Sequence, residues 1–322
     1  MSETITRRHV LAAVASMLTT AVQAQPSGVT RLVVGFAPGG TADSLARVLA
    51  PLLGLSGQTV IVENKPGASG QLAAETVRQS ANDGHTLLVT PSSILSLVPH
   101  LYRKPMYDSL RDFAPVGCLC DHSFGFAVPG NSPVKTVGQF IEWARANPRD
   151  ATFATPGPGT APHFLGVVFG RDQNIPMVHV PYKGVAPGLQ DLISGQVASS
   201  FNPLPAMLEF HKAGRIRILA VTNPSRLAGL SAVPTFSELG MQPLELVEWY
   251  GVFASAKVQP AIVDRLATHL KQAVAKPEMA VAAERLEVKP RFASSTELAQ
   301  MLAADYKRWE GLARATGITL DS

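Results

Sequence analysis

Residues 31–50 read RLVVGFAPGGTADSLARVLA and set the pattern that the rest of the chain repeats. Arg31 to Phe36 is a short apolar run typical of a buried strand, and an amphipathic helix is expected from Thr41, which suits the N-cap. The glycines between them allow a ligand close to the backbone, and the free N–H groups of a helix start can hold an anion. The stretch predicts a strand, a glycine loop and a helix, which form either an anion site or an ordinary turn of an α/β domain.

The composition and the motifs exclude several classes of function. A chain of 322 residues with 46% hydrophobic residues can form two domains, and its formal charge of +4 is dispersed, so we expect no nucleic-acid partner. The loop from Gly35 to Thr41 lacks the lysine of a phosphate loop and does not match G-x-G-x-x-G, so no nucleotide cofactor is expected. The eight histidines form no cluster with metal-ligand spacing, so we expect no metal site.

Residues 1–24 resemble a secretory signal peptide. Arg7 and Arg8 precede an apolar run from Val10 to Val22, and a small-x-small cleavage site ends at Ala24. The paired arginines leave the twin-arginine route open beside the general secretory route. We expect the mature chain to start near Gln25, just after this cleavage site. No later segment reaches about 18 apolar residues, the length that would span a membrane, so we expect the mature chain in the periplasm.

The two cysteines, Cys118 and Cys120, stand one residue apart on a predicted strand. That spacing puts both side chains on the same face of a strand, where a disulfide would strain the extended backbone. We therefore expect two buried, unpaired thiols.

The strand, loop and helix pattern recurs along the chain. In the first part, loops follow the predicted strands Thr59 to Glu63 and His85 to Thr90. In the middle, the loops Pro156 to Thr160 and Pro181 to Gly184 follow two more predicted strands. Ligands of an open parallel sheet bind beyond the carboxyl ends of its strands, so we expect these loops to rim a site.

Two apolar segments connect the two halves of the pattern. Phe113 to Val128 is expected to carry the chain out of the first lobe, and Leu246 to Ala254 to bring it back, with Trp249 and Tyr250 filling the hinge or core. We predict residues 25–124 plus 247–322 as lobe 1 and residues 125–246 as lobe 2. The predicted architecture is an α/β fold whose lobes close on a ligand cleft.

Six segments in order along the chain match one protein family. They are VVGFAPGG at 33–40, VENKPGASG at 62–70, DGHTLL at 83–88, GPGT at 157–160 with His163, VPYKG at 180–184 and WYGVFA at 249–254. On these motifs the chain resembles the Bug-type extracytoplasmic solute receptors of tripartite tricarboxylate transporters. The resemblance implies a two-lobed, type II-like periplasmic-binding-protein fold with two crossover strands. It also implies a monomer that holds a small carboxylate, passes it to membrane permease subunits and catalyses no reaction.

The resemblance assigns binding residues by position. On lobe 1 they are Phe36, Ala37, Gly39, Gly40, Thr41, Thr90, Ser92 and Ser93, and on lobe 2 they are Pro158, Gly159, Thr160, His163, Lys183, Phe201 and Asn202. His163 could instead cap and pack its own helix, and Lys183 could be solvated. The helix starts and hydroxyls in this set suit the oxygens of a dicarboxylate, a tricarboxylate or an aromatic carboxylate.

Asn202 departs from the family pattern, which often has an aspartate at this position. An amide carries no charge to pair with a ligand ammonium group, so we expect a ligand that lacks one. Two other functions stay open, a sensor that signals to a membrane histidine kinase and a periplasmic hydrolase. The hydrolase is the weaker alternative, because Ser92 and Ser93 lack the G-x-S-x-G frame of a nucleophilic serine.

Overall fold

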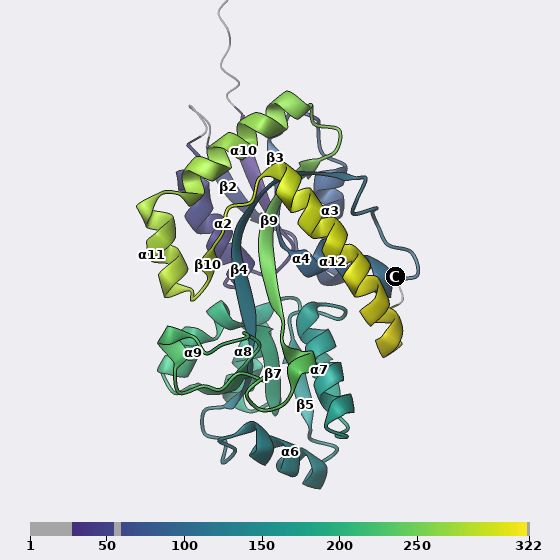
Figure 1. Cartoon of the computed structure of the whole chain (residues 1–322), viewed down its shortest axis with the longest axis vertical. Coiled ribbons are helices and arrows are strands. Elements are labelled where there is room, and N and C mark those ends of the chain that lie inside the picture. Colours follow the sequence, from purple (N-terminus) through teal and green to yellow (C-terminus); the bar gives the residue numbers. More distant parts are fainter. Residues whose placement is uncertain (1–27, 55–58, 321–322) are drawn as a thin grey trace, which may run out of the picture.

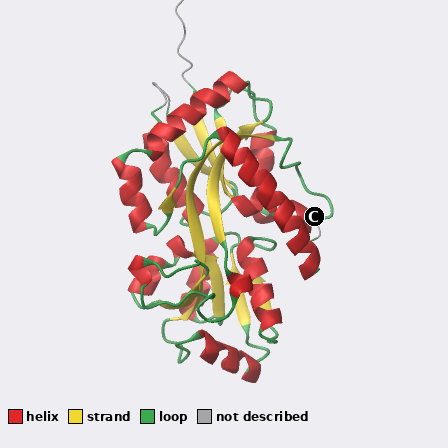
Figure 2. Ribbon diagram, in the orientation of Figure 1, coloured by secondary structure: helices red, strands yellow, loops and turns green. Residues whose placement is uncertain are grey.

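The computed structural model describes residues 28–54 and 59–320 and shows two lobes, one above the other (Figure 1). Helices pack around a central group of strands in both lobes (Figure 2). The α/β class predicted from the sequence is therefore confirmed. The signal peptide predicted over residues 1–24 lies outside the described residues.

Lobe 1 is built on three parallel strands in the order β2-β1-β3, and β3 pairs antiparallel with β9. Helix α2 buries Leu45 and Leu49 against this sheet, as its helical periodicity predicts. The elements are β1 (Thr30–Val34), α2 (Thr41–Leu52), β2 (Val60–Asn64), η1 (Ala68–Gly70), α3 (Gln71–Arg78), β3 (Thr86–Pro91), α4 (Ser92–Ser96), α5 (Val98–Leu101) and β9 (Val247–Ser255).

Lobe 2 repeats the parallel arrangement with β5 between β6 and β7. Its core is aromatic, and the rings of Phe126 and Phe201 stack with their centroids 4.6 Å apart. The elements are α6 (Val137–Ala146), β5 (Thr152–Thr155), α7 (Ala161–Asp172), β6 (Val178–Pro181), α8 (Val185–Ser194), β7 (Ser199–Pro203), η2 (Leu204–Ala206), α9 (Leu208–Lys212), β8 (Ile216–Val221), η3 (Ala228–Leu230) and η4 (Gln242–Leu244).

Two long strands join the lobes, and both run down the middle of the molecule in Figure 1. Strand β4 (Phe113–Pro129) pairs with β9 as far as Ser123 and with β7 and β8 beyond it. The predicted double crossing is therefore present, whereas the lobe boundaries after residues 124 and 246 stay predictions. In this pairing His122 and Glu248 are direct partners.

The two cysteines are free and buried, as predicted, but they do not share a face. Cys118 packs in a cluster with Phe253, whereas Cys120 packs in another cluster with Val252. The register between β4 and β9 shifts between the two cysteines, and a bulge inserts an extra residue that turns the following side chain to the other face. The prediction of a shared face was wrong for this reason.

Three helices at the C-terminal end pack largely on lobe 1. They are α10 (Pro260–Val274), α11 (Pro277–Arg285) and α12 (Ser295–Thr316), with the short strand β10 (Lys289–Pro290) paired to β4. On α12, the Trp309 ring meets Phe164 of α7 edge-on at a centroid distance of 5.0 Å, so this helix contacts both lobes. Among the described helices, none is long and apolar enough to cross a membrane.

Candidate functional site

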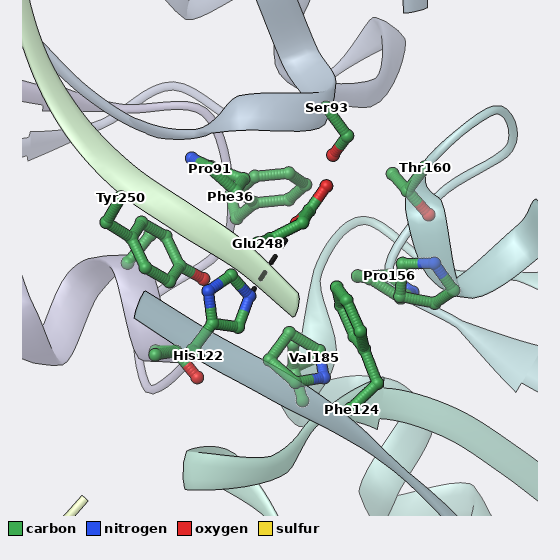
Figure 3. A pocket seen from close by; sticks show the side chains of 15 residues that line it. Phe36, Pro91, Ser93, His122, Phe124, Pro156, Thr160, Val185, Glu248 and Tyr250 are labelled. Carbon is green, nitrogen blue, oxygen red and sulfur yellow. Dashed lines mark ion pairs between the residues drawn. The ribbon is translucent and has the colours of Figure 1, made fainter. Parts of the chain in front are cut away.

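A pocket lies where the two lobes meet (Figure 3). It encloses about 30 Å³, which is small beside the roughly 300–1,000 Å³ of typical ligand pockets. Loops of both lobes and both crossover strands form its wall, through Phe36, Gly40, Thr41, Ala42, Pro91, Ser93, His122, Phe124, Pro156, Thr160, Pro162, Val185, Pro203, Glu248 and Tyr250.

The first strand, loop and helix unit forms one wall of the pocket. Gly40 is the N-cap of α2, so Thr41, which was expected to be the cap, is the first helical residue. The Thr41 Oγ1 is buried and has no hydrogen-bond partner among the described residues. Asp43 fixes the loop, because its Oδ2 accepts hydrogen bonds from Gly39 N–H at 3.0 Å and from Arg47 Nε at 2.9 Å. The start of α2 is therefore held in place at the pocket.

The loop before α7 forms the opposite wall. Thr160 is the N-cap of α7, and its Oγ1 donates a hydrogen bond to Gly157 O at 2.7 Å. His163 Nδ1 accepts a hydrogen bond from Gly159 N–H at 3.0 Å. Burial lowers the pKa of His163 to about 4, so the ring is a neutral acceptor at pH 7. In this structure His163 has the local capping role that the sequence left open.

Direct contacts between loops of the two lobes close the pocket. Ala37 N–H donates a hydrogen bond to Lys183 O at 3.2 Å, and Ser69 Oγ donates one to Pro158 O. Loops that were predicted to rim one cleft from opposite lobes therefore face each other, and the structure describes a closed arrangement.

The predicted binding residues fall into two groups. Those that line the pocket are Phe36, Gly40, Thr41, Ser93 and Thr160. Those outside its lining are Ala37, Gly39, Thr90, Ser92, Pro158, Gly159, His163, Lys183, Phe201 and Asn202. Phe201 is fully buried in the aromatic core of lobe 2. Asn202 is buried beside the lining residue Pro203, and its Oδ1 has no hydrogen-bond partner among the described residues.

The crossover strands supply a part of the wall that was not predicted from the sequence. His122 and Phe124 on β4, and Glu248 and Tyr250 on β9, all line the pocket. Tyr250 was expected only in the hinge or core. A titratable residue inside an apolar strand is a sequence signal for a functional site, and His122 and Glu248 are both such residues. Their proximity could not be predicted, because it depends on the register between β4 and β9.

His122 and Glu248 form a buried pair in this wall (Figure 3). The His122 Nε2 lies 3.6 Å from Glu248 Oε2, and the two residues are 3% and 2% exposed. Burial raises the pKa of Glu248 to about 8, although hydrogen bonding to Ser93 acts in the opposite direction. Burial also lowers the pKa of His122 to about 3. Both groups are therefore mainly neutral at pH 7.

The arrangement can hold an anion without a cationic side chain. None of the described residues that line the pocket is Lys or Arg. Three helices begin at its wall, α2 at Thr41, α7 after Thr160 and α8 at Val185. Each helix start carries free N–H groups and partial positive charge. The described residues contain no group of three or more His, Cys, Asp or Glu that could hold a metal ion.

Known proteins match this chain over most of its length. The sequence model of one protein family, described as the tripartite tricarboxylate transporter family receptor, matches residues 45–318 of this chain. The periplasmic binding protein BugD is 28% identical, with a TM-score of 0.86 over 91% of this chain and 98% of that one. Rpa4515 of R. palustris, solved with adipate, is 32% identical, with a TM-score of 0.87 over 92% and 100% of the two chains. MatC of Rhodopseudomonas palustris, solved with bound malate, is 26% identical, with a TM-score of 0.84 over 89% and 99%.

Proposed function

Because the chain belongs to the tripartite tricarboxylate transporter family of receptors, we propose that it captures a small carboxylate between its lobes and delivers it to the permease of such a transporter. It works in the periplasm, which the signal-like residues 1–24 and the periplasmic relative BugD support, and we propose that it does so as a monomer. The ligand is a dicarboxylate, a tricarboxylate or an aromatic carboxylate.

The convergence of three helix starts on one pocket carries the proposal. Helices α2 and α7 belong to opposite lobes and begin at Thr41 and Ala161, and α8 begins at Val185. A carboxylate placed between them accepts hydrogen bonds from backbone N–H groups of both lobes. Such a ligand draws the two lobes together around itself, because only lobes that face each other bring both sets of donors to one anion.

The apolar lining supports a ligand with a carbon chain or a ring. Phe36, Phe124 and Tyr250 supply aromatic surface to the pocket. Adipate and malate, seen with two related proteins, are both small dicarboxylates. Since the closed pocket encloses about 30 Å³, a ligand of this size requires the lobes to stand further apart than they do in this structure, both to enter and to be held.

The geometry of the pocket supports binding over hydrolysis. In a serine hydrolase a histidine lies between the serine and the acid and takes the serine proton. Here Glu248 stands between Ser93 and His122 (Figure 3), and its carboxyl is mainly protonated at pH 7. A protonated carboxyl cannot accept a proton from Ser93, so this order of groups does not activate the serine.

A thermal-shift screen at pH 7 tests the proposed function. The panel contains adipate, malate, citrate and benzoate, with adipamide as the uncharged control. A ligand at 100 times its Kd stabilises the folded state by about 2.7 kcal/mol, which raises the melting temperature. We expect at least one carboxylate to do so and adipamide to have no effect. An equal shift with adipamide, or no shift with any carboxylate, contradicts the proposal.

A further inference from the structure

Glu248 is placed to touch whatever enters the pocket. It lies between Ser93 of lobe 1 and His122 of β4 (Figure 3). Its position on β9 fixes it opposite His122, because the two residues are register partners. The side chain is 2% exposed in the closed arrangement and belongs to the pocket lining.

Polar atoms of the Glu248–His122 pair lack hydrogen-bond partners among the described residues. Glu248 Oε1 and both ring nitrogens of His122 are buried and have no hydrogen-bond partner among the described residues. The Nε2–Oε2 distance of 3.6 Å is too long for a hydrogen bond. A buried polar atom without a partner destabilises the folded protein, so a ligand that supplies the partner gains that free energy on binding.

Few charges act on Glu248. His122 faces it from β4, Tyr250 lies two residues along β9, and Asp305 and Arg308 act on it from α12 with opposite sign. His122 also lines a second cavity whose titratable groups are Asp121, Glu284, Glu287 and Lys289. Within the described lining of the main pocket there is no Lys or Arg to hold Glu248 ionised. Burial therefore dominates and favours the neutral acid.

We propose that Glu248 is a specificity-determining residue that binds the ligand as a neutral carboxylic acid, with its O–H donating a hydrogen bond to a ligand oxygen. This inference rests on the proposed function. An ionised Glu248 would repel a carboxylate in a pocket without cationic side chains, whereas the protonated acid donates to it. Glu248 thus selects a ligand with an acceptor oxygen at this point, and a ligand ammonium group finds no anion there. The uncharged amide of Asn202 likewise predicts a ligand that lacks an ammonium group.

The proposal makes carboxylate binding depend on one proton. In the closed arrangement Glu248 holds the proton well below pH 8, so affinity depends little on pH between the pKa values of the ligand's own carboxyl groups and about pH 7. Above pH 8 the ligand-free protein loses the proton and must recover it on binding. Affinity then falls about tenfold for each pH unit, and binding takes up one proton.

Calorimetry with Glu248→Gln is the test, because glutamine copies the shape and the hydrogen-bond donor of the neutral acid. The probe is whichever of adipate and malate shifts the melting temperature more. We expect wild-type affinity to fall about tenfold between pH 8.5 and 9.5. We expect Glu248→Gln to bind within a few-fold of wild type at pH 7 and to be insensitive to pH. The exposed control Glu142→Gln on α6 should follow the wild type.

A measurement on the ligand-free protein separates the proposed role of Glu248 from the proposed carboxylate-binding function. Carbon-13 NMR of the Glu248 carboxyl, assigned by its absence in Glu248→Gln, should titrate with a midpoint near 8. A midpoint below 6, a pH-independent wild-type affinity, or loss of binding in a folded Glu248→Gln variant would overturn the inference alone. If no carboxylate binds wild type at pH 6.5 while NMR shows Glu248 protonated, the proposed function fails and the inference falls with it.

Discussion

Gly40 has no side chain, so the backbone at the start of α2 is uncovered where it faces lobe 2. A Cβ atom added there would lie 3.7 Å from Val185 Cγ2, so a larger side chain would project into the closed pocket. We expect Gly40→Leu to weaken carboxylate binding by roughly 100-fold, about 2–3 kcal/mol, by obstructing closure. Titration calorimetry measures this effect. Gly311→Leu on α12, where nothing lies within 4 Å of the added Cβ, is the control. Wild-type affinity in Gly40→Leu would remove this loop from the site.

The buried pair in the pocket predicts how the free energy of unfolding depends on pH. The pKa of Glu248 is raised from 4.5 to about 8, so the folded protein holds a proton that the unfolded chain loses, and stability decreases as pH rises through this window. His122 has the opposite effect, because its lowered pKa reduces stability as pH falls from 6.5 toward 3.

Glu248→Gln should remove the loss of stability at high pH. Between pH 6 and pH 9 we expect the wild type to lose up to about 3 kcal/mol relative to this variant. Urea unfolding of both proteins at the two pH values gives the difference. Equal losses in the two proteins would mean that Glu248 ionises as easily in the folded protein as in the unfolded chain.

At the scale of elements, the loop before α7 depends on a side chain of that same helix. His163→Ala removes the acceptor of the Gly159 N–H, and such a loss costs about 1–3 kcal/mol of stability. Because this loop brings Thr160 to the pocket, we also expect carboxylate affinity to fall roughly tenfold. Chemical unfolding and calorimetry measure the two effects. His269→Ala on α10 is the matched control, and an unchanged affinity in His163→Ala would show that the loop holds its shape without the ring.

Elements with a local signature could be predicted from the sequence. Of the strand predicted from Arg31 to Phe36, residues Arg31 to Val34 lie in β1, and the helix after it starts at Thr41, because apolar periodicity and glycine loops act over a few residues. The family resemblance names Thr41 and Thr160 as binding residues, and both line the pocket. Local reasoning could not name Glu248, since the strand that carries it looks like ordinary core. Its role at the wall depends on pairing with His122, far away in sequence, and on the closure of the lobes.

At the scale of the whole molecule, α12 links lobe 1 to lobe 2. The contact between Trp309 and Phe164 buries Trp309 to 1% exposure in the closed arrangement. If the lobes hinge, Trp309→Leu weakens this contact and favours opening. Small-angle scattering of the ligand-free variant should give a larger radius of gyration than wild type, and added adipate should compact both. Trp143→Leu on α6, within lobe 2, is the control. Identical profiles with and without saturating ligand would indicate a rigid cleft.

The central claim is that helix starts from the two lobes hold one carboxylate. A crystal structure with the tightest-binding carboxylate of the thermal-shift panel tests it most directly. We predict ligand oxygens within hydrogen-bond distance of backbone N–H groups at the starts of both α2 and α7, with Glu248 beside the ligand. A ligand held outside the pocket, or held chiefly by the Lys183 ammonium group, would contradict the account.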